Sequence, residues 1–148
     1  MQDLRQGTAA DVPAIRALTR AAYAKWVPVT GREPLPMTAD YDDAIQQHRF
    51  DLLHLDGELA ALIETVAKPD HLLIENLAVA PPFQGRGLGR RMMAHAEALA
   101  AGAGLAEIRL FTNKLFAENI RLYTALGYRV DREETLNGGT AVHMSKQL

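Results

Sequence analysis

The sequence predicts a mixed α/β fold, formed by one domain over residues 1–148. Two hairpin signals indicate antiparallel strands, because Asp56-Gly57 and Asn137-Gly138-Gly139 each separate two strand-like runs. A third observation indicates a parallel strand pair. A buried strand, a glycine-rich loop, a helix and a second strand follow one another, and that order requires a right-handed crossover. A chain of this length can bury a sizeable core without disulfides.

The first half of the chain is expected to hold a short strand, two helices and a hairpin. The run 8–11 resembles a capping box, Pro13 suits a first helical turn, and apolar residues then recur at helical spacing. Three prolines and a glycine predict a loop at 27–36. The expected elements are strand 4–6, helix 12–22, helix 39–48, strand 51–55 and strand 58–66.

The second half is expected to hold the crossover unit and a final hairpin. The run 71–79 is almost continuously apolar, which is typical of a strand buried on both faces. Glycines predict the ends of the two helices that follow, at Gly102 and at Gly127. The expected elements are strand 71–79, helix 88–101, strand 106–112, helix 117–126, strand 128–135 and strand 140–146.

Composition narrows the classes of function. The formal net charge is −2, which gives no global basic field for nucleic acid. No apolar run approaches the ~20 residues of a membrane span, and the N-terminus lacks the apolar stretch of a signal peptide. We therefore expect a cytoplasmic protein, with neither nucleic acid nor a membrane as partner.

Two nucleophiles are nearly absent from the chain. It has no Cys, and its one Ser, Ser145, lies in no Gly-x-Ser-x-Gly elbow. If the protein transfers an acyl group, we expect the acceptor to attack directly, with no acyl-enzyme. The five histidines show no metal-ligand spacing, so no metal is expected.

The sharpest signal is the loop Gln84-Gly85-Arg86-Gly87-Leu88-Gly89. Glycine lacks Cβ, so its amide can approach a ligand closely. The loop leads into a helix, whose first turn has unpaired N–H groups and a partial positive charge. The neighbouring arginines add full charge, and the combination predicts a phosphate site. The alternative is a glycine turn with solvated arginines.

The glycine spacing discriminates among phosphate ligands. The dinucleotide fingerprint Gly-x-Gly-x-x-Gly fails, because position 90 is Arg. The P-loop of nucleoside triphosphate enzymes also fails, because neither Lys-Ser nor Lys-Thr follows the glycines. A nucleotide-binding regulator is therefore disfavoured.

The pattern Gln84-x-x-Gly87-x-Gly89, after a buried strand and before a helix, resembles the acetyl-CoA motif of GNAT N-acetyltransferases. The flanks are similar too: 76–81 resembles the fourth strand of that family, and 119–128 its last helix and the strand after it. The resemblance covers nearly the whole chain and is weakest at 28–51. It implies the GNAT acyl-CoA N-acyltransferase fold, in which a parallel strand pair splays apart and admits the cofactor.

The resemblance also implies acetyl-CoA as acetyl donor and assigns groups to hold it. Main-chain groups of Leu77 and Val79 would pair with the pantetheine arm, amides of 86–90 would hold the pyrophosphate, and Asn119 would bind from the far side. The residues expected at the cofactor are Leu77, Ala78, Val79, Gln84, Gly85, Arg86, Gly87, Leu88, Gly89, Arg90, Asn119 and Tyr123.

Acetyl transfer to an amine needs a base, because an alkylammonium with a pKa of about 10.4 is no nucleophile. Glu75 is the candidate, since a carboxylate in an apolar strand is costly without a task or a partner. The alternatives are pairing with an arginine and positioning of substrate. Tyr123 shares a helix face with Asn119 and is the candidate acid for the leaving thiolate, with a core tyrosine as the alternative. By resemblance, the N–H of Leu77 is the expected oxyanion donor.

The segment between the first two helices is expected to line the acceptor site. Tyr23, Trp26 and Arg32 are the candidates there, beside Glu75, although Tyr23 and Trp26 could instead fill the core. The sequence thus predicts an N-acetyltransferase acting on a primary amine of a small molecule or peptide. A binding module that senses acyl-CoA without turnover is the alternative. The resemblance also allows a homodimer.

Overall fold

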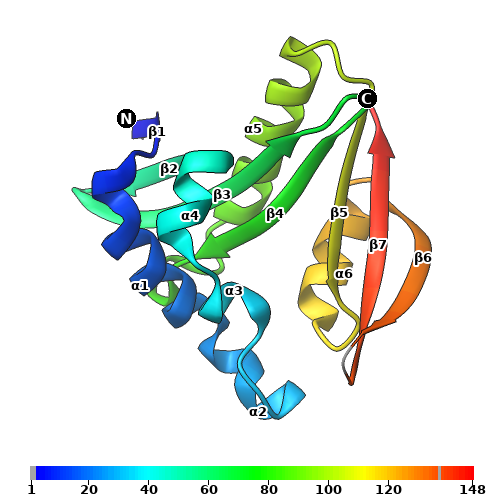
Figure 1. The fold of residues 1–148 in the computed structure, drawn as a ribbon, viewed down its shortest axis with the longest axis horizontal. Helices are drawn as coiled ribbons and strands as arrows, with labels where there is room; N and C mark the ends of the chain where they lie inside the picture. The colour runs from blue at the N-terminus through cyan, green and yellow to red at the C-terminus, as the bar shows by residue number, and fades with distance from the viewer. Residues whose placement is uncertain (1–2, 137) are drawn as a thin grey trace.

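The computed structural model describes residues 3–136 and 138–148, and its strands form one seven-stranded sheet in the order β1-β2-β3-β4-β5-β7-β6 (Figure 1). Neighbouring strands are antiparallel except for the parallel pair β4–β5, which confirms the predicted mixed fold class. The strands are β1 (Asp3–Gln6), β2 (Arg49–Leu55), β3 (Glu58–Ala67), β4 (Leu72–Val79), β5 (Glu107–Asn113), β6 (Arg129–Leu136) and β7 (Gly139–Gln147).

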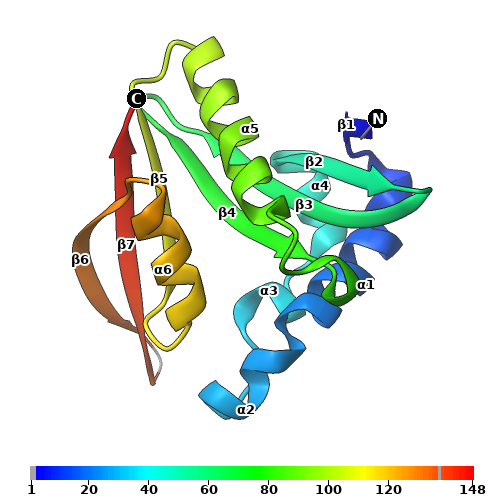
Figure 2. The same cartoon turned by 180° about the vertical axis from the view of Figure 1, so that it is seen from behind.

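Helices cover both faces of this sheet. The α-helices are α1 (Val12–Tyr23), α2 (Val27–Thr30), α3 (Leu35–Thr38), α4 (Tyr41–Gln47), α5 (Leu88–Gly102) and α6 (Ala117–Ala125), with 3-10 turns η1 (Ala9–Asp11), η2 (Ala24–Trp26) and η3 (Pro81–Phe83). α1, α3 and α4 lie over one face of β2–β4, whereas α5 and α6 lie on the other side (Figures 1 and 2). Within the described residues, no helix is long and apolar enough to span a membrane.

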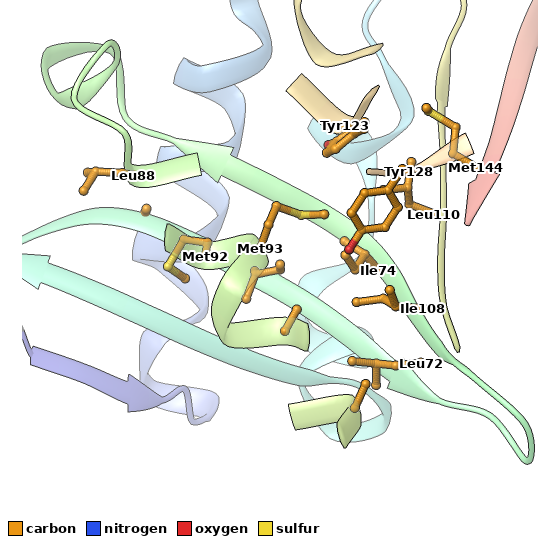
Figure 3. Packing of buried hydrophobic residues seen from close by; sticks show 14 of the residues in the cluster. Leu72, Ile74, Leu88, Met92, Met93, Ile108, Leu110, Tyr123, Tyr128 and Met144 are labelled. Carbon is orange, nitrogen blue, oxygen red and sulfur yellow. The ribbon is translucent and has the colours of Figure 1, made fainter. Parts of the chain in front are cut away.

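Two clusters of buried side chains fill the space between the layers. One lies beneath α1 and α4. The other lies between α5 and the central strands, where Met92 and Met93 are completely buried beside Ile74 and Ile108 (Figure 3). Burying each such side chain stabilises the fold by about 1.5–3 kcal/mol relative to leaving it in water.

The parallel contact between β4 and β5 is short. Its register joins only residues 72–74 to residues 108–110, and beyond Ile74 the two strands diverge (Figure 1). On its other edge, β4 carries one residue more than β3 at this point, because Asn76 pairs with Glu64 while Ile74 pairs with Thr65. This leaves Glu75 as a β-bulge. A bulge bends its strand and increases the local twist, so it accounts for the divergence.

The bulge also changes which face of the sheet the next side chains of β4 point to. Ile74 belongs to the cluster under α5, yet Asn76, two residues later, contacts Tyr23 of α1. The prediction of a strand buried on both faces was wrong, because β4 alternates between buried and half-buried residues. The half-buried positions include Leu77 and Val79, which line a cavity.

The predicted loop at 27–36 was also wrong, because it contains α2 and the start of α3. Proline is tolerated in a first helical turn, where its missing N–H has no partner to lose, and both short helices begin in that way. Gly31, with φ of 77°, ends α2 in the left-handed conformation.

Other predicted boundaries moved by one or two residues. α4 starts at Tyr41 rather than at 39, because Asp40 is its N-cap and accepts a hydrogen bond from the Asp43 N–H at 3.2 Å. β6 and β7 form the predicted antiparallel hairpin. Asn137, part of its predicted turn, lies outside the described residues.

The short parallel contact makes its core side chains important for stability. Ile108 is completely buried and lies opposite Leu72 in the register. We expect Ile108→Ala to lower the free energy of unfolding by about 2–5 kcal/mol, because it leaves a cavity in this contact. Val130→Ala, at a half-exposed position of edge strand β6, should change it by less than about 0.5 kcal/mol. Urea denaturation measures the free energy of unfolding of both variants. Equal losses in the two would contradict the importance of Ile108 for the β4–β5 contact.

Candidate active site

Two cavities occupy the region where β4 and β5 diverge. The first has a volume of about 280 Å³ and lies between the end of β4, the glycine loop and the start of α6. It is lined by Ala22, Tyr23, Lys25, Trp26, Leu77, Ala78, Val79, Phe83, Gln84, Gly85, Gly87, Leu88, Gly89, Arg90, Glu118, Asn119, Leu122 and Tyr123. Most residues expected at the cofactor are therefore brought together in one cleft.

The glycine loop has the geometry of an anion cradle. Gly85 and Gly87 both have φ of 78°, a conformation that L side chains rarely adopt, and Gly87 is the N-cap of α5. A Cβ on either would meet no atom within 4 Å, so the space beside each glycine is open, and neither N–H donates a backbone hydrogen bond within the described part of the chain. The N–H groups of the first turn of α5 have no intrahelical partner and supply partial positive charge.

The two arginine side chains beside the loop, Arg86 and Arg90, have different surroundings. Arg90 lines the first cavity, whereas Arg86 is directed to the ring of Phe83, with 5.3 Å between guanidinium and ring centre. Arg86, expected at the cofactor, is thus not among the lining residues. Lys25, which the sequence reasoning missed, does line the cavity; its Nζ lies 3.2 Å from the Glu118 carboxylate and 3.5 Å from the Gln84 amide oxygen. No local pattern could have identified Lys25, because both partners are distant in sequence.

The free edge of β4 presents main-chain groups to the same cleft. The Ala80 N–H donates to the Ala60 carbonyl, so the alternation of an antiparallel ladder turns the main-chain groups of Ala78 toward β3. Leu77 and Val79 therefore direct theirs toward the edge that β5 has left. Their carbonyls accept hydrogen bonds from side chains, from Tyr23 at 3.3 Å and Gln84 at 3.0 Å respectively.

The second cavity, of about 340 Å³, adjoins the first on the other side of this edge. Its walls come from α2 and α3, from β4 and β5, and from the start of β7. It is lined by Tyr23, Thr30, Arg32, Glu33, Pro34, Leu35, Pro36, Ile74, Glu75, Asn76, Leu77, Leu110, Phe111, Thr112, Asn113, Phe116, Asn119, Tyr123, Gly139, Thr140 and Ala141. The two cavities share Tyr23, Leu77, Asn119 and Tyr123, which define the junction between them.

Glu75 lines only the second cavity, at the bulge of β4. It forms no ion pair with any residue that the structure describes, so pairing with an arginine does not account for it. A second carboxylate, Glu64, is buried behind it and lies 2.6 Å from Nδ1 of His48. Desolvation raises the pKa of Glu64, with a smaller rise from the charge of Glu75, while the hydrogen bond with His48 opposes both.

Tyr123 lies at the junction and also belongs to the core. It is buried, and its ring packs edge-on to Tyr128 with 6.1 Å between ring centres (Figure 3). Burial raises the pKa of Tyr123 to about 12, so its hydroxyl is a proton donor at neutral pH. The same residue therefore satisfies the core interpretation and faces both cavities.

The residues expected at the acceptor divide between the cavities. Tyr23 lines both, and Arg32 lines the second. Trp26 lines only the first, but it stacks, with 4.5 Å between ring centres, on Phe116, which lines the second. Trp26 is thus one residue removed from the cavity that holds Glu75. Among the described residues there is no group of three side chains suited to hold a metal ion.

Comparison with known proteins identifies the family. The sequence profile of the Acetyltransferase (GNAT) family matches residues 14–128, from α1 to the residue before β6. The chain belongs to the GNAT acetyltransferase family. This confirms the resemblance that the glycine loop and its flanks indicate.

Two curated relatives are acetyltransferases by name. N-alpha-acetyltransferase 80 of Mus musculus is 37% identical over 71 residues, 48% of this chain and 21% of that protein. Streptothricin acetyltransferase of Streptomyces lavendulae is 33% identical over 92 residues, 61% of this chain and 48% of the relative. The chain thus aligns with less than half the length of either relative.

A solved structure shows the same fold over the whole chain. PaiA N-acetyltransferase from Thermoplasma acidophilum, solved in complex with coenzyme A, has a TM-score of 0.79 at 16% identity. The match covers 100% of this chain and 99% of that structure.

The anion cradle can be tested by binding alone. We expect Gly87→Val to raise the Kd for acetyl-CoA at least tenfold, because a β-branched residue at this φ costs about 1–3 kcal/mol and covers the open amides. Gly102→Ala, at the other end of α5, meets no atom within 4 Å and should bind normally. Isothermal titration measures both variants, and normal binding by Gly87→Val would remove the loop from the cofactor site.

Proposed function

We propose that this GNAT protein transfers the acetyl group of acetyl-CoA directly to a primary amine of a small molecule or a peptide. The observation that carries the proposal is the junction of the two cavities. One cavity has the anion cradle and the free strand edge, the other has Glu75, and they meet at Leu77 and Tyr123. A donor and an acceptor bound on opposite sides would therefore meet at that junction.

The first cavity fits acetyl-CoA in two respects. The open amides at Gly85 and Gly87 suit a diphosphate. The Leu77 carbonyl and the Val79 N–H suit a pantetheine amide chain, which would lie along β4 like an added strand and leave the Leu77 N–H free for the thioester. When bound, acetyl-CoA supplies a thioester carbonyl. The N–H of Leu77 is then the group that stabilises negative charge on the carbonyl oxygen.

Glu75 is the proposed base for the acceptor. An amine reaches the protein mainly as an ammonium ion, with a pKa of about 10.4, and must lose a proton before it can attack. The carboxylate of Glu75 faces the second cavity and is not held by an ion pair among the described residues, which leaves it available to accept that proton. This role can be direct or through one water molecule.

Tyr123 is the proposed acid. A departing thiolate benefits from a proton, since thiols have a pKa of about 8.5. The pKa of Tyr123 is raised to about 12 by burial, which keeps its phenol protonated and able to donate. No covalent acyl-enzyme on serine or cysteine is required; the chain has no Cys, and Ser145 is buried in β7.

The proposal is tested by thiol release from acetyl-CoA with three named acceptors: 2-phenylethylamine, streptothricin and a hexapeptide with a free N-terminus. Acetylation of at least one, confirmed by mass spectrometry, is the expected result. A protein that binds acetyl-CoA tightly but acetylates none of them is the result expected of an acyl-CoA sensor, and it would count against the proposal.

Removal of the base should have a pH-dependent effect. We expect Glu75→Gln to lower kcat/KM by about 10²–10⁴-fold at neutral pH while acetyl-CoA binds normally. The deficit should shrink as the pH rises, because the amine then loses its proton to water. A pH profile of kcat/KM checks this, and a deficit that stays constant with pH would assign Glu75 to substrate positioning instead.

Removal of the acid should affect turnover alone. Tyr123→Phe keeps the buried ring and removes one hydroxyl, so we expect kcat to fall by about 10²–10⁴-fold with an unchanged Kd for acetyl-CoA. Tyr128→Phe is the control, because Tyr128 lies outside both cavities and its hydroxyl donates to Glu97 at 3.0 Å. Wild-type turnover in Tyr123→Phe would exclude Tyr123 as the acid and leave it only its packing role in the core.

A further inference from the structure

Asn76 is a buried polar residue to which the proposed chemistry assigns no task. It is 4% exposed and follows the bulge at Glu75, which turns its side chain toward α1 and α4. An amide in this position is costly unless its donor and acceptor groups both have partners. The Oδ1 and the Nδ2 of Asn76 each have a partner, and both partners are tyrosine hydroxyls.

The two hydrogen bonds run in fixed directions. The hydroxyl of Tyr23 donates its one proton to Asn76 Oδ1 at 2.9 Å, in preference to the more distant Leu77 carbonyl at 3.3 Å, and Asn76 Nδ2 donates to the hydroxyl of Tyr41 at 3.4 Å. Tyr41 in turn donates to the Pro36 carbonyl at 2.6 Å. The single proton of Tyr41 is thus committed to Pro36, so Tyr41 can only accept from residue 76. A side chain here must therefore accept on one side and donate on the other, as an amide does.

The ends of this chain of hydrogen bonds are parts of the candidate site. Tyr23 lies at the junction of the cavities and also contacts the Leu77 carbonyl. Pro36 belongs to the wall of the second cavity that residues 34–36 form. Asn76 therefore connects the place where acetyl would be transferred to the wall against which an acceptor would rest.

Burial keeps this arrangement in one protonation state. The pKa of Tyr23 lies well above its usual value because of burial, with smaller contributions from Tyr123, Tyr41 and Glu64. Burial likewise raises the pKa of Tyr41 to about 12. Both hydroxyls therefore remain donors throughout the range in which an acetyltransferase works.

The same wall has a second attachment that does not involve Asn76. Arg20 of α1 donates to the Met37 carbonyl at 2.9 Å and forms an ion pair with Glu33 at 2.6 Å. Arg20 and Glu33 are both half-exposed, so solvent weakens this pair. Loss of the buried chain should accordingly loosen the wall without unfolding it.

We propose that Asn76 is a positioning residue for the acceptor: its amide, between Tyr23 and Tyr41, sets the place of wall 34–36 relative to the junction. The inference rests on the proposed amine acetylation, because it takes the second cavity as the acceptor site. It assigns Asn76 no contact with the reacting atoms. Its loss should therefore weaken acceptor binding and leave the binding of acetyl-CoA intact.

The kinetic test uses 2-phenylethylamine as the probe amine and the variants Asn76→Leu and Tyr41→Phe, which remove polar groups at nearly constant volume. We expect each to raise the KM for the amine about tenfold, with kcat changed less than threefold and the Kd for acetyl-CoA within twofold of wild type. The double variant should be no worse than the worse single variant, because both cut one chain of hydrogen bonds. Gln47→Ala, an exposed change on the same helix as Tyr41, is the control.

A second measurement needs no substrate. Hydrogen exchange of the Met37 amide, which donates to the Pro34 carbonyl at 2.9 Å, reports on the wall directly. Exchange should be faster in Asn76→Leu and Tyr41→Phe and unchanged in Gln47→Ala. Unchanged exchange, strictly additive KM effects, or a parallel loss of acetyl-CoA binding would each overturn the proposal. If wild type fails to acetylate the probe while exchange responds as expected, it is the choice of acceptor that fails, not the positioning by Asn76.

Discussion

The parallel contact between β4 and β5 ends after three residue pairs, and the rest of the candidate site depends on that limit. A strand that continued in register would bond to the main-chain groups of Leu77 and Val79 and close the space between the strands. The bulge at Glu75 prevents this, because one extra residue in β4 bends the strand away from its partner. It also places a carboxylate at the point of divergence. One local irregularity thus creates the free edge, opens the cleft and turns Asn76 to the opposite face.

Features that a few neighbouring residues determine could be predicted from the sequence. Features that depend on contacts between residues far apart in the sequence could not. The glycine loop, the Asp56-Gly57 hairpin and the helix ends depend on backbone conformations that a few residues dictate, and these are present in the structure. The segment from 27 to 36 was mistaken for a loop, because prolines that usually mark loops here occupy first helical turns. The divergence of β4 from β5 was expected from the family resemblance alone, because an apolar run looks the same whether a neighbouring strand covers it or not.

The same distinction applies to the site residues. Glu75, Tyr123 and the loop were found from residue type, spacing and family resemblance, and the structure brings them around two adjoining cavities. Lys25 and Asn76 were missed because their partners lie far along the chain, at Glu118 and Tyr41. Trp26, predicted at the acceptor, lines the first cavity and stacks on Phe116 of the second, so its role there stays a prediction. Sequence identifies reactive groups more readily than the contacts that orient them.

The stacking of Trp26 on Phe116 has a consequence for how the cleft behaves. Together with the Lys25–Glu118 pair, it joins η2, the turn that follows α1, to the start of α6 beside the first cavity. The two halves of the sheet are therefore connected twice, by β-pairing where the strands begin and by this aromatic and ionic bridge where they have separated. Both connections would have to stretch before the two strands could separate further. Of the two, the aromatic stack is the firmer, because solvent weakens the exposed ion pair.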